Sequence, residues 1–369
     1  MAENIKHWVW LSSIPQIGAV KSRKLLEHFG DPKCIWEADI LDLKGLDFLT
    51  AANVNSIRNV KYREEAEKHF ENIYKYGIKV IPITDKAYPE YLRNIYDPPV
   101  VLYSRGKLGK DEKRLAVVGS RKATTYGLNI AKTISHDLAQ MGIAIVSGMA
   151  RGVDSFAHKG ALDAKGRTIA VLGCGLDTVY PRENKELMEN IEVSGATISE
   201  YIPGVKPMPQ NFPARNRIIS GLSLGVIVIE AGDKSGSLIT ADFALEQGRE
   251  VFAVPGNLDS MNSKGTNRLI KEGAKMITGV DDILEELKMN FESEEIQKQE
   301  FSVPVKKPFY HDLDQDEIKL VENLQPQPLH IDALASKCCF SIQATHSIIT
   351  MLELKGIVEQ DPGKIFRLK

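Results

Sequence analysis

The sequence predicts an α/β protein: a Rossmann-like, doubly wound, mostly parallel sheet with a small helical N-terminal domain and a C-terminal winged helix. Three observations predict this class. Short, continuously apolar runs alternate with helical stretches in the middle of the chain, as in strands buried on both faces. Apolar positions recur at helical spacing before these runs. Three helical patterns and a β-hairpin follow them.

The composition fits a chain with a substantial hydrophobic core. The 369 residues are 43% hydrophobic and 26% charged, which excludes a disordered chain, a collagen-like repeat and a disulfide scaffold. The cysteines, Cys34, Cys174, Cys338 and Cys339, lack metal-ligand spacing, so we expect reduced thiols, no metal and no cofactor. The net charge of −2 means that any basic site must be local.

Residues 1–72 are predicted to form the helical domain, because Leu25, Leu26 and Phe29 recur at helical spacing. Residues 14–18 and 43–46 look alike, and each precedes a helix. This similarity suggests paired helix-hairpin-helix units, which present backbone N–H groups to a phosphate. A helical packing or interaction domain is the alternative.

The N-terminus carries no visible targeting signal. Residues 1–11 contain a glutamate and mixed polar residues, which do not suit a secretory signal. No apolar run approaches the roughly 18 residues that a membrane span needs. We therefore expect a cytoplasmic protein without a membrane span.

Residues 76–288 are predicted to form the α/β domain. The apolar runs are separated by stretches long enough for crossover helices. A strand–helix–strand pattern around Tyr91 and Leu92 extends the sheet on the N-terminal side. The runs assigned to strands are residues 78–83, 100–103, 115–118, 143–146, 168–172, 225–229 and 251–254.

Residues 289–311 are charged, contain two prolines and are predicted to form an exposed linker. Residues 312–369 then follow the order of a winged helix. The expected helices are residues 316–324, 331–338 and 341–354, and the expected hairpin has strands at 356–358 and 365–368 around a turn at 361–363.

The charge of the winged helix argues against a major role in duplex binding. Residues 312–369 hold nine acidic and six basic residues, and the helix over 341–354 contains Glu353 but no lysine or arginine. Duplex binding needs phosphate neutralisation that this helix does not supply. We favour a protein contact or a regulatory role. Weak duplex binding through Lys364, Arg367 and Lys369 is the alternative.

Glycine-marked turns follow nearly every expected strand of the α/β domain. In open α/β sheets, ligands bind beyond the carboxyl ends of the strands, and glycine lets backbone N–H groups turn toward an anion. A single such turn is a common feature of the fold, but a row of them along one edge of the sheet indicates an extended site for phosphates. The candidate residues in these turns are Gly119, Ser120, Arg121, Gly148, Arg151, Gly152, Ser235, Gly236 and Ser237.

A segment without acidic residues lies between Glu200 and Glu230. Arginine binds phosphates bidentately, asparagine supplies donors, and an aromatic ring can stack on a base. Solvated arginines with a phenylalanine in the core are the alternative. The candidates of this segment are Lys206, Asn211, Phe212, Arg215 and Arg217, and Arg182, just after another strand, extends the same groove.

The remaining motifs in the sequence give weaker indications of function. Residues 173–178 lack the third glycine of a dinucleotide fingerprint, and Walker and G-x-S-x-G motifs are absent. His158, four residues after Asp154, has the spacing of a paired base, but a structural role is favoured. Asp177 is interpreted as a turn or cap residue. A solvated helix face explains the cluster Lys264, Arg268 and Lys271 about as well as a basic site does.

Several motifs together resemble the DNA-processing protein DprA family, also called Smf. The similarity is close over about residues 105–280, and the helical domain and winged helix fit the family's fuller architecture. The matching segments are residues 117–121, 147–154, 168–177 with Tyr180 and Pro181, 212–220, 235–241 and 248–256.

The resemblance implies a protein without catalytic activity. Members bind single-stranded DNA that enters during natural transformation, protect it and load the RecA recombinase onto it. They form homodimers through the Rossmann-like domain. By position, the family's pocket arginine is Arg121, and Arg182 matches a further basic residue. Phe212, Arg215 and Arg217 lie in its aromatic–arginine motif, whereas no RecA-contact residue can be assigned.

Two other functions are the alternatives to DNA binding. The same Rossmann variant resembles phosphoribohydrolases that cleave nucleoside monophosphates, whose glycine loop carries a catalytic glutamate. Aligning Gly236 and Ser237 with that loop puts Thr240 at the glutamate position, and Glu246 lies too far along. Threonine cannot act as that base, so the hydrolase is disfavoured. A transcription regulator is disfavoured by the charge of the winged helix.

Overall fold

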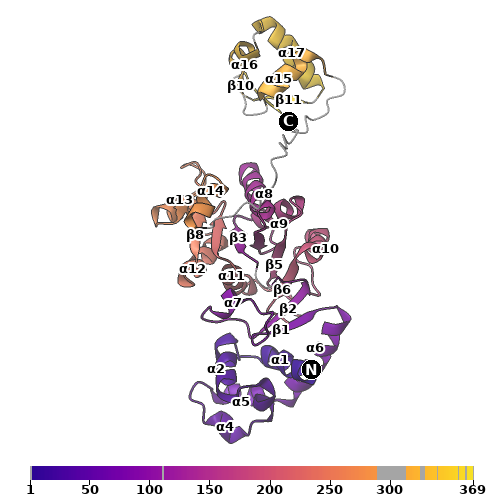
Figure 1. Cartoon of the computed structure of the whole chain (residues 1–369), viewed down its shortest axis with the longest axis vertical. Helices are drawn as coiled ribbons and strands as arrows, with labels where there is room; N and C mark the ends of the chain where they lie inside the picture. Colours follow the sequence, from indigo (N-terminus) through magenta and orange to yellow (C-terminus); the bar gives the residue numbers. More distant parts are fainter. Residues whose placement is uncertain are drawn as a thin grey trace. The chain divides into compact units, whose positions relative to one another are not determined.

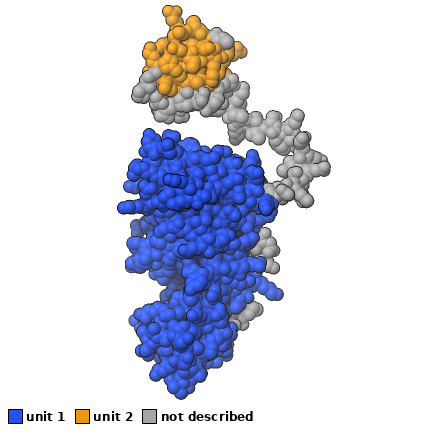
Figure 2. All heavy atoms as spheres, turned by 90° about the vertical axis from the view of Figure 1, so that its left-hand side faces the viewer, with its two compact units in different colours: residues 1–291 blue, residues 292–369 orange. Residues whose placement is uncertain are grey.

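A computed structural model of the chain describes residues 2–109, 112–288, 313–324, 329–338, 340–355, 357–361 and 364–368. The chain divides into two compact units, residues 1–291 and 292–369 (Figure 2). The predicted linker at 289–311 lies outside the described residues. So do Cys339, Gly356, the turn residues Pro362 and Gly363, and Lys369.

The N-terminal segment is helical, as predicted. Asp31 caps one helix, whose first residue is Pro32, and Thr50 with Asn53 forms a capping box at another. The segment has a core of its own around Trp10, Leu25 and Ile57. Its helices are α1 (Ala2–Ser13), α2 (Ala19–Phe29), α3 (Pro32–Glu37), α4 (Ile40–Lys44), α5 (Ala51–Arg58) and α6 (Val60–Lys75).

This helical segment packs directly on one edge of the sheet, at the indigo end of Figure 1. Trp8 and Val9 of α1 share a core with Tyr103 of strand β2 (Val101–Gly106). The Ser12 hydroxyl lies 2.7 Å from the Tyr103 hydroxyl. The helical segment and the sheet therefore form one compact unit.

The first unit contains a nine-stranded sheet in the order β1-β2-β6-β5-β4-β3-β7-β8-β9. From β6 to β9 along this order, each strand pairs in parallel with the next. Strand β2 pairs antiparallel with β6, and β1 pairs antiparallel with β2. The mostly parallel class is therefore confirmed. The remaining strands are β1 (Lys79–Pro82), β3 (Arg114–Val118), β4 (Ala144–Ser147), β5 (Thr168–Leu172), β6 (Ala196–Ser199), β7 (Gly225–Val228), β8 (Glu250–Ala253) and β9 (Lys275–Met276).

Both faces of the central strands are buried, which explains their unbroken apolar runs. On β3, Ala116 and Val118 join the core on one face, and Leu115 and Val117 join the core on the other. The first face is covered by α7 (Glu90–Arg93), α11 (Asn211–Gly221), α12 (Gly236–Glu246) and α13 (Lys264–Lys271), and the second by α8 (Thr125–Gln140), α9 (Val153–Asp163) and α14 (Val280–Glu286). Helix α10 (Lys185–Ser194) packs on β5 and β6.

The strand order reverses between β3 and β7. The chain runs from β3 through β4 and β5 to β6 in one direction, and β7 then returns to pair with the other side of β3. Such a switch point opens a crevice at the carboxyl ends of the two strands. The loops after β3 and β7 therefore diverge around a natural ligand position.

Strand β6 was not among the predicted strands. Its polar residues Thr197 and Ser199 interrupt the apolar run, yet both are fully buried. Their hydroxyls donate to Glu192 Oε1 at 2.9 Å and to the Cys174 carbonyl at 2.8 Å. Because these local bonds satisfy the hydroxyls, a half-polar sequence can occupy the middle of the sheet.

The second unit is a winged helix, as predicted. Its buried core includes Leu334, Ile349, Leu352 and Phe366. Lys355 Nζ donates to Glu317 Oε1 at 2.7 Å and to Oε2 at 2.8 Å. The short strand β10 was not predicted. The elements are α15 (Gln315–Leu324), β10 (Leu329–His330), α16 (Ile331–Cys338), α17 (Ile342–Leu354), β11 (Val358–Asp361) and β12 (Ile365–Leu368).

Across the part of the chain that the structure describes, no helix combines the length and apolar character needed to cross a membrane.

Candidate functional site

A groove runs along the carboxyl ends of β5, β4, β3 and β7. It consists of a large hollow of about 730 Å³ and a small one of about 30 Å³, which share Arg121, Ala150, Tyr180 and Phe212. We call the two hollows together the edge groove. Of the predicted residues, those lining it are Gly119, Ser120, Arg121, Gly148, Arg151, Phe212, Arg215, Ser235, Gly236 and Ser237.

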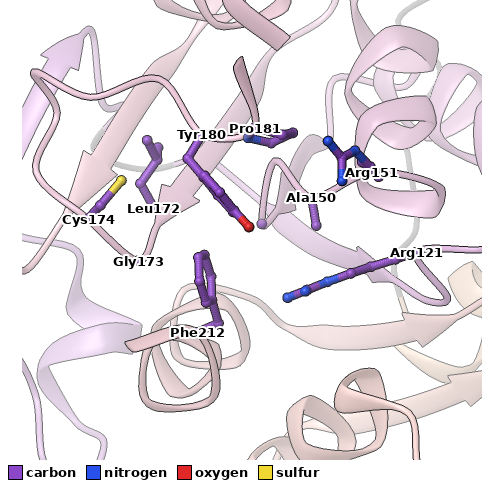
Figure 3. Close-up of a pocket in the computed structure, with 10 residues that line it drawn as sticks. Arg121, Ala150, Arg151, Leu172, Gly173, Cys174, Tyr180, Pro181 and Phe212 are labelled. Atoms are coloured by element: carbon purple, nitrogen blue, oxygen red, sulfur yellow. The ribbon is translucent and has the colours of Figure 1, made fainter. Parts of the chain in front are cut away.

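Aromatic rings and a guanidinium meet at the centre of the edge groove (Figure 3). The Phe212 ring lies between the other two groups. Its centroid is 5.5 Å from Arg121 Cζ and 5.3 Å from the centroid of Tyr180, with the two rings tilted by 35°. Tyr180 is 41% exposed, and Arg121 is exposed as well. Accessible π-faces and an unburied cation are thus placed side by side.

Two glycines shape the loops beneath this cluster. Gly152 has φ 77°, and a Cβ there would lie 2.3 Å from the Ser120 carbonyl oxygen. A Cβ on Gly148 would lie 1.8 Å from Arg215 Nη1. Gly152 does not line the groove; it lets the loop after β4 pack against the loop that carries Arg121.

A buried pair of opposite charges lies at the floor of the edge groove. Arg215 of α11 is 3% exposed and Asp154 of α9 is 8% exposed. Burial lowers the pKa of Arg215 to about 10, although Asp154 acts to raise it. Burial also raises the pKa of Asp154, which Arg215 and the Ala150 amide act to lower. Arg215 Nη2 donates to the Gly148 carbonyl at 2.9 Å.

The amino end of α12 forms the far wall. Ser235 caps the helix, and its hydroxyl lies 2.7 Å from that of Ser237. Asn216 Nδ2 donates to the Gly236 carbonyl at 3.2 Å, which ties α11 to this wall. The first turn of α12 contains no acidic residue, so the positive end of the helix dipole is not offset within the helix.

Arg217 lies apart from the other predicted arginines. Its side chain is 7% exposed and does not line the edge groove. Nε donates to Asp97 Oδ2 at 2.9 Å, and Nη1 and Nη2 donate to Glu200 Oε1 and Oε2 at 3.0 and 2.8 Å. Two carboxylates thus bind the guanidinium, which favours a structural role for Arg217 over a DNA contact.

Other predicted residues sit at the margin of the groove or away from it. Arg182 and Lys206 are exposed and line neither hollow. Asn211 Nδ2 donates to the Gly173 carbonyl at 3.1 Å, so it fixes the start of α11 beside Phe212. Arg151 lines the small hollow and pairs with Glu183.

The structure adds residues that the prediction omitted. Lys122, Asn216, Lys234 and Asn262 line the large hollow with Tyr180. Lys122 and Lys234 stand in the same glycine-marked loops, so the rule that selected their neighbours would have found them. Asn262 carries no such signal, because it reaches the site by donating to the Lys122 carbonyl at 3.0 Å across the fold.

His158 is a structural residue, as the sequence favoured. The Thr168 hydroxyl donates to the Ile145 carbonyl at 2.8 Å, so His158 Nδ1 must donate to Thr168 Oγ1 at 2.7 Å. Burial lowers the pKa of His158 to about 3. The ring is fully buried and does not line the edge groove. Within the described residues, no three His, Cys, Asp or Glu side chains gather as metal ligands do.

Comparison with known proteins adds independent information. The family model "DNA recombination-mediator protein A" matches residues 79–288, and "DprA winged helix domain" matches residues 305–364. Protein Smf of Synechocystis sp. is 33% identical, with 97% of each chain covered. DNA processing protein DprA of Bacillus subtilis is 41% identical over 68% of this chain and 88% of its own.

Two solved structures are similar in fold and sequence. DNA processing protein A from Streptococcus pneumoniae superposes with a TM-score of 0.63 at 35% identity, covering 76% of this chain and 97% of its own. The second is DNA processing protein A from Helicobacter pylori, in a structure that addresses the single-stranded DNA binding mode of that protein. It superposes with a TM-score of 0.52 at 32% identity, covering 57% of this chain and 95% of its own.

Proposed function

The chain belongs to the DNA recombination-mediator protein A family, also named DprA or Smf, and on that premise we propose that it binds single-stranded DNA in the edge groove. One observation carries the proposal. Arg121, the exposed Tyr180, the partly buried Phe212 and the amino end of α12 all line the large hollow. Cations and backbone amides suit phosphates, and the rings suit unpaired bases.

The geometry favours a single strand over a duplex. Unpaired bases can turn out and stack on Phe212 and Tyr180, whereas the faces of the bases in a duplex are covered by the neighbouring base pairs. The loops that line the groove lie side by side in the spatial order of β5, β4, β3 and β7. A backbone that follows this row meets Arg151, Arg121 and Lys234 in turn. Binding is therefore expected to depend on salt and to tolerate any sequence.

A binding role suits the groove better than hydrolysis. Thr240, at the position where the phosphoribohydrolases carry their glutamate, lines the large hollow and is 1% exposed. Asp154 also lines it, but this carboxylate is buried and accepts a hydrogen bond from the Ala150 amide at 3.3 Å. Neither side chain is placed as an accessible general base.

The wider role follows from the resemblance. The protein protects incoming DNA during natural transformation, loads RecA onto it, acts in the cytoplasm and pairs with a second copy through the α/β domain. Arg182 and Lys206 remain candidates for contact with DNA that extends beyond the edge groove, because both side chains are exposed.

The winged helix serves a protein contact or regulation in this proposal. The exposed residues of α17 include Ile342, Gln343, His346 and Met351, and the described helix contains no lysine or arginine. Of the wing residues considered for duplex binding, Lys364 is exposed, whereas the Arg367 side chain and Lys369 lie outside the described part of the chain.

Fluorescence anisotropy of a labelled dT20 strand tests the DNA site. The full chain is titrated at two salt concentrations, with an unlabelled duplex as competitor. Arg121→Gln is expected to weaken binding about tenfold and to flatten the salt dependence by about 0.7 in log–log slope. Arg268→Gln is the matched control, since Arg268 is exposed on α13 and does not line the groove. Equal competition by duplex, with no effect of Arg121→Gln, overturns the proposal.

A further inference from the structure

An acidic residue lies where a DNA-binding groove should be uniformly basic. Asp154, the second residue of α9, lines the large hollow together with Arg121 and Arg215. A carboxylate repels phosphate, and burial reduces the screening of that repulsion by salt. Its presence in the wall calls for an explanation beyond binding.

Asp154 and Arg215 hold the same loop from two sides. Asp154 Oδ2 accepts from the Ala150 amide at 3.3 Å, and Arg215 Nη2 donates to the Gly148 carbonyl at 2.9 Å. Between these two contacts Met149 has φ 59°, a conformation that side chains rarely adopt. The opposite charges therefore keep the loop in a shape that it would not hold alone.

The same pair determines the charge of the groove floor. Arg121 and Arg215 contribute two positive charges, and Asp154 acts electrostatically on both. When Asp154 is ionised, it offsets the buried Arg215 and leaves Arg121 as the uncompensated cation of this cluster. When Asp154 is neutral, both guanidiniums attract the strand.

We propose that Asp154 sets the affinity of the edge groove for single-stranded DNA, by offsetting the charge of Arg215 so that a bound strand can be released. This inference rests on the proposed function. It makes Asp154 a positioning residue that acts through Arg215 and the loop of residues 148–152. A protein that hands its DNA to another protein needs such a limit on affinity, because a strand held too tightly is not transferred.

Lowering the pH acts on this cluster through Asp154, because burial raises the pKa of its carboxyl above the usual value. Arg215 remains charged at neutral pH, because its pKa is about 10. The other groups that act on Arg215 are His158, Cys174 and Tyr201. Their pKa values of about 3, 11 and 12 keep all three neutral. A pH profile therefore reports on Asp154 in a way that a purely structural role would not reproduce.

The test compares the full chain with Asp154→Asn, which removes the charge but keeps an oxygen to accept from Ala150. At pH 8 and 50 mM salt, dT20 is expected to bind the variant about fivefold more tightly, because a negative charge is removed from a partly buried position in the groove. The gap between the two proteins should narrow as the pH is lowered, because the raised pKa of Asp154 lets the wild-type carboxylate take up a proton. The salt slope should steepen by up to about 0.7.

Two further variants control for charge and fold. Asp177→Asn is the matched control, because Asp177 also accepts a backbone hydrogen bond, from Gly204 at 2.9 Å, but does not line the groove. The double variant Asp154→Asn/Arg215→Gln removes both charges and should bind within about threefold of wild type. If thermal unfolding shows that Asp154→Asn does not fold, Asp154→Ser replaces it, with the same expectation.

The outcomes separate this inference from the proposed function. Equal or weaker binding by the folded Asp154 variant, with wild type still sensitive to Arg121→Gln, overturns only the inference. Equal tightening by Asp177→Asn also overturns it, because the effect would then reflect net charge. Failure of the wild-type chain to bind dT20 overturns the proposed function.

Discussion

Replacing Arg217 with methionine distinguishes a structural arginine from a DNA contact. The change keeps the length and apolar stem of the side chain but removes three hydrogen bonds of 2.8 to 3.0 Å to Asp97 and Glu200. The carboxylates then lose their counter-charge, with Glu200 only 17% exposed and Asp97 36% exposed. Breaking a buried ion pair lowers stability by about 3–5 kcal/mol. Because Asp97 is partly exposed, we expect a loss of about 3 kcal/mol here.

A loss of that size is easily measured. Thermal unfolding followed by circular dichroism should show the midpoint of the first unit falling by roughly 6 °C, and urea unfolding should show the lower free energy directly. The affinity of the folded variant for dT20 should stay within about twofold of wild type. Arg121→Gln should do the reverse, with an unchanged midpoint and about tenfold weaker binding. An Arg217→Met variant that melts normally but loses DNA would refute this assignment and return Arg217 to the DNA site.

Three further predictions concern buried or constrained residues. His158 stays neutral in the fold, with a pKa of about 3, but takes up a proton near pH 6.5 when unfolded, so acid favours unfolding. Between pH 7.5 and 5.5, urea unfolding should show wild type losing about 1.4 kcal/mol more stability than His158→Gln; parallel pH profiles would contradict this. Burial raises the pKa of the Cys174 thiol to about 11, so iodoacetamide at pH 7.5 should label the exposed Cys34 and spare Cys174 until urea is added. Rapid native labelling of Cys174, read by mass spectrometry, would argue against this packing. Gly152→Ala forces a Cβ to within 2.3 Å of the Ser120 carbonyl at φ 77°, so it should lower stability by at least about 1 kcal/mol and weaken DNA binding, whereas Gly236→Ala, with open space around it, should leave the urea midpoint unchanged.

The position of the edge groove follows from topology together with local sequence. Gly119–Arg121 and Ser235–Ser237 belong to loops that leave neighbouring strands in opposite directions, because the strand order reverses between β3 and β7. Glycine-marked strand ends therefore point to the edge of the sheet at which the groove lies. They did not identify which side chains turn into the groove, since that depends on how each helix packs behind its loop.

Local pattern was sufficient for most of the architecture. Continuous apolar runs are a direct consequence of burial on both faces, so β3, β4, β5, β7 and β8 could be read from the chain, as could the three helices of the winged helix. Strand β6 could not, because the hydrogen bonds that make Thr197 and Ser199 acceptable in the core come from Glu192 and from the carbonyl of Cys174.

Arg215 and Arg217 show what could not be predicted from the sequence alone. Two residues apart on α11, they belong to one motif, and composition and spacing assign them the same role. Positions i and i+2 of a helix point to different sides, so the fold sends Arg215 to the groove and Arg217 to Asp97, 120 residues away in the chain, and to Glu200. Local sequence was enough to predict the fold class, the loops that line the edge groove and the residue types that suit a phosphate backbone. Long-range packing settles what each guanidinium contacts: Arg215 lines the groove beside Asp154, whereas Asp97 and Glu200 bind Arg217.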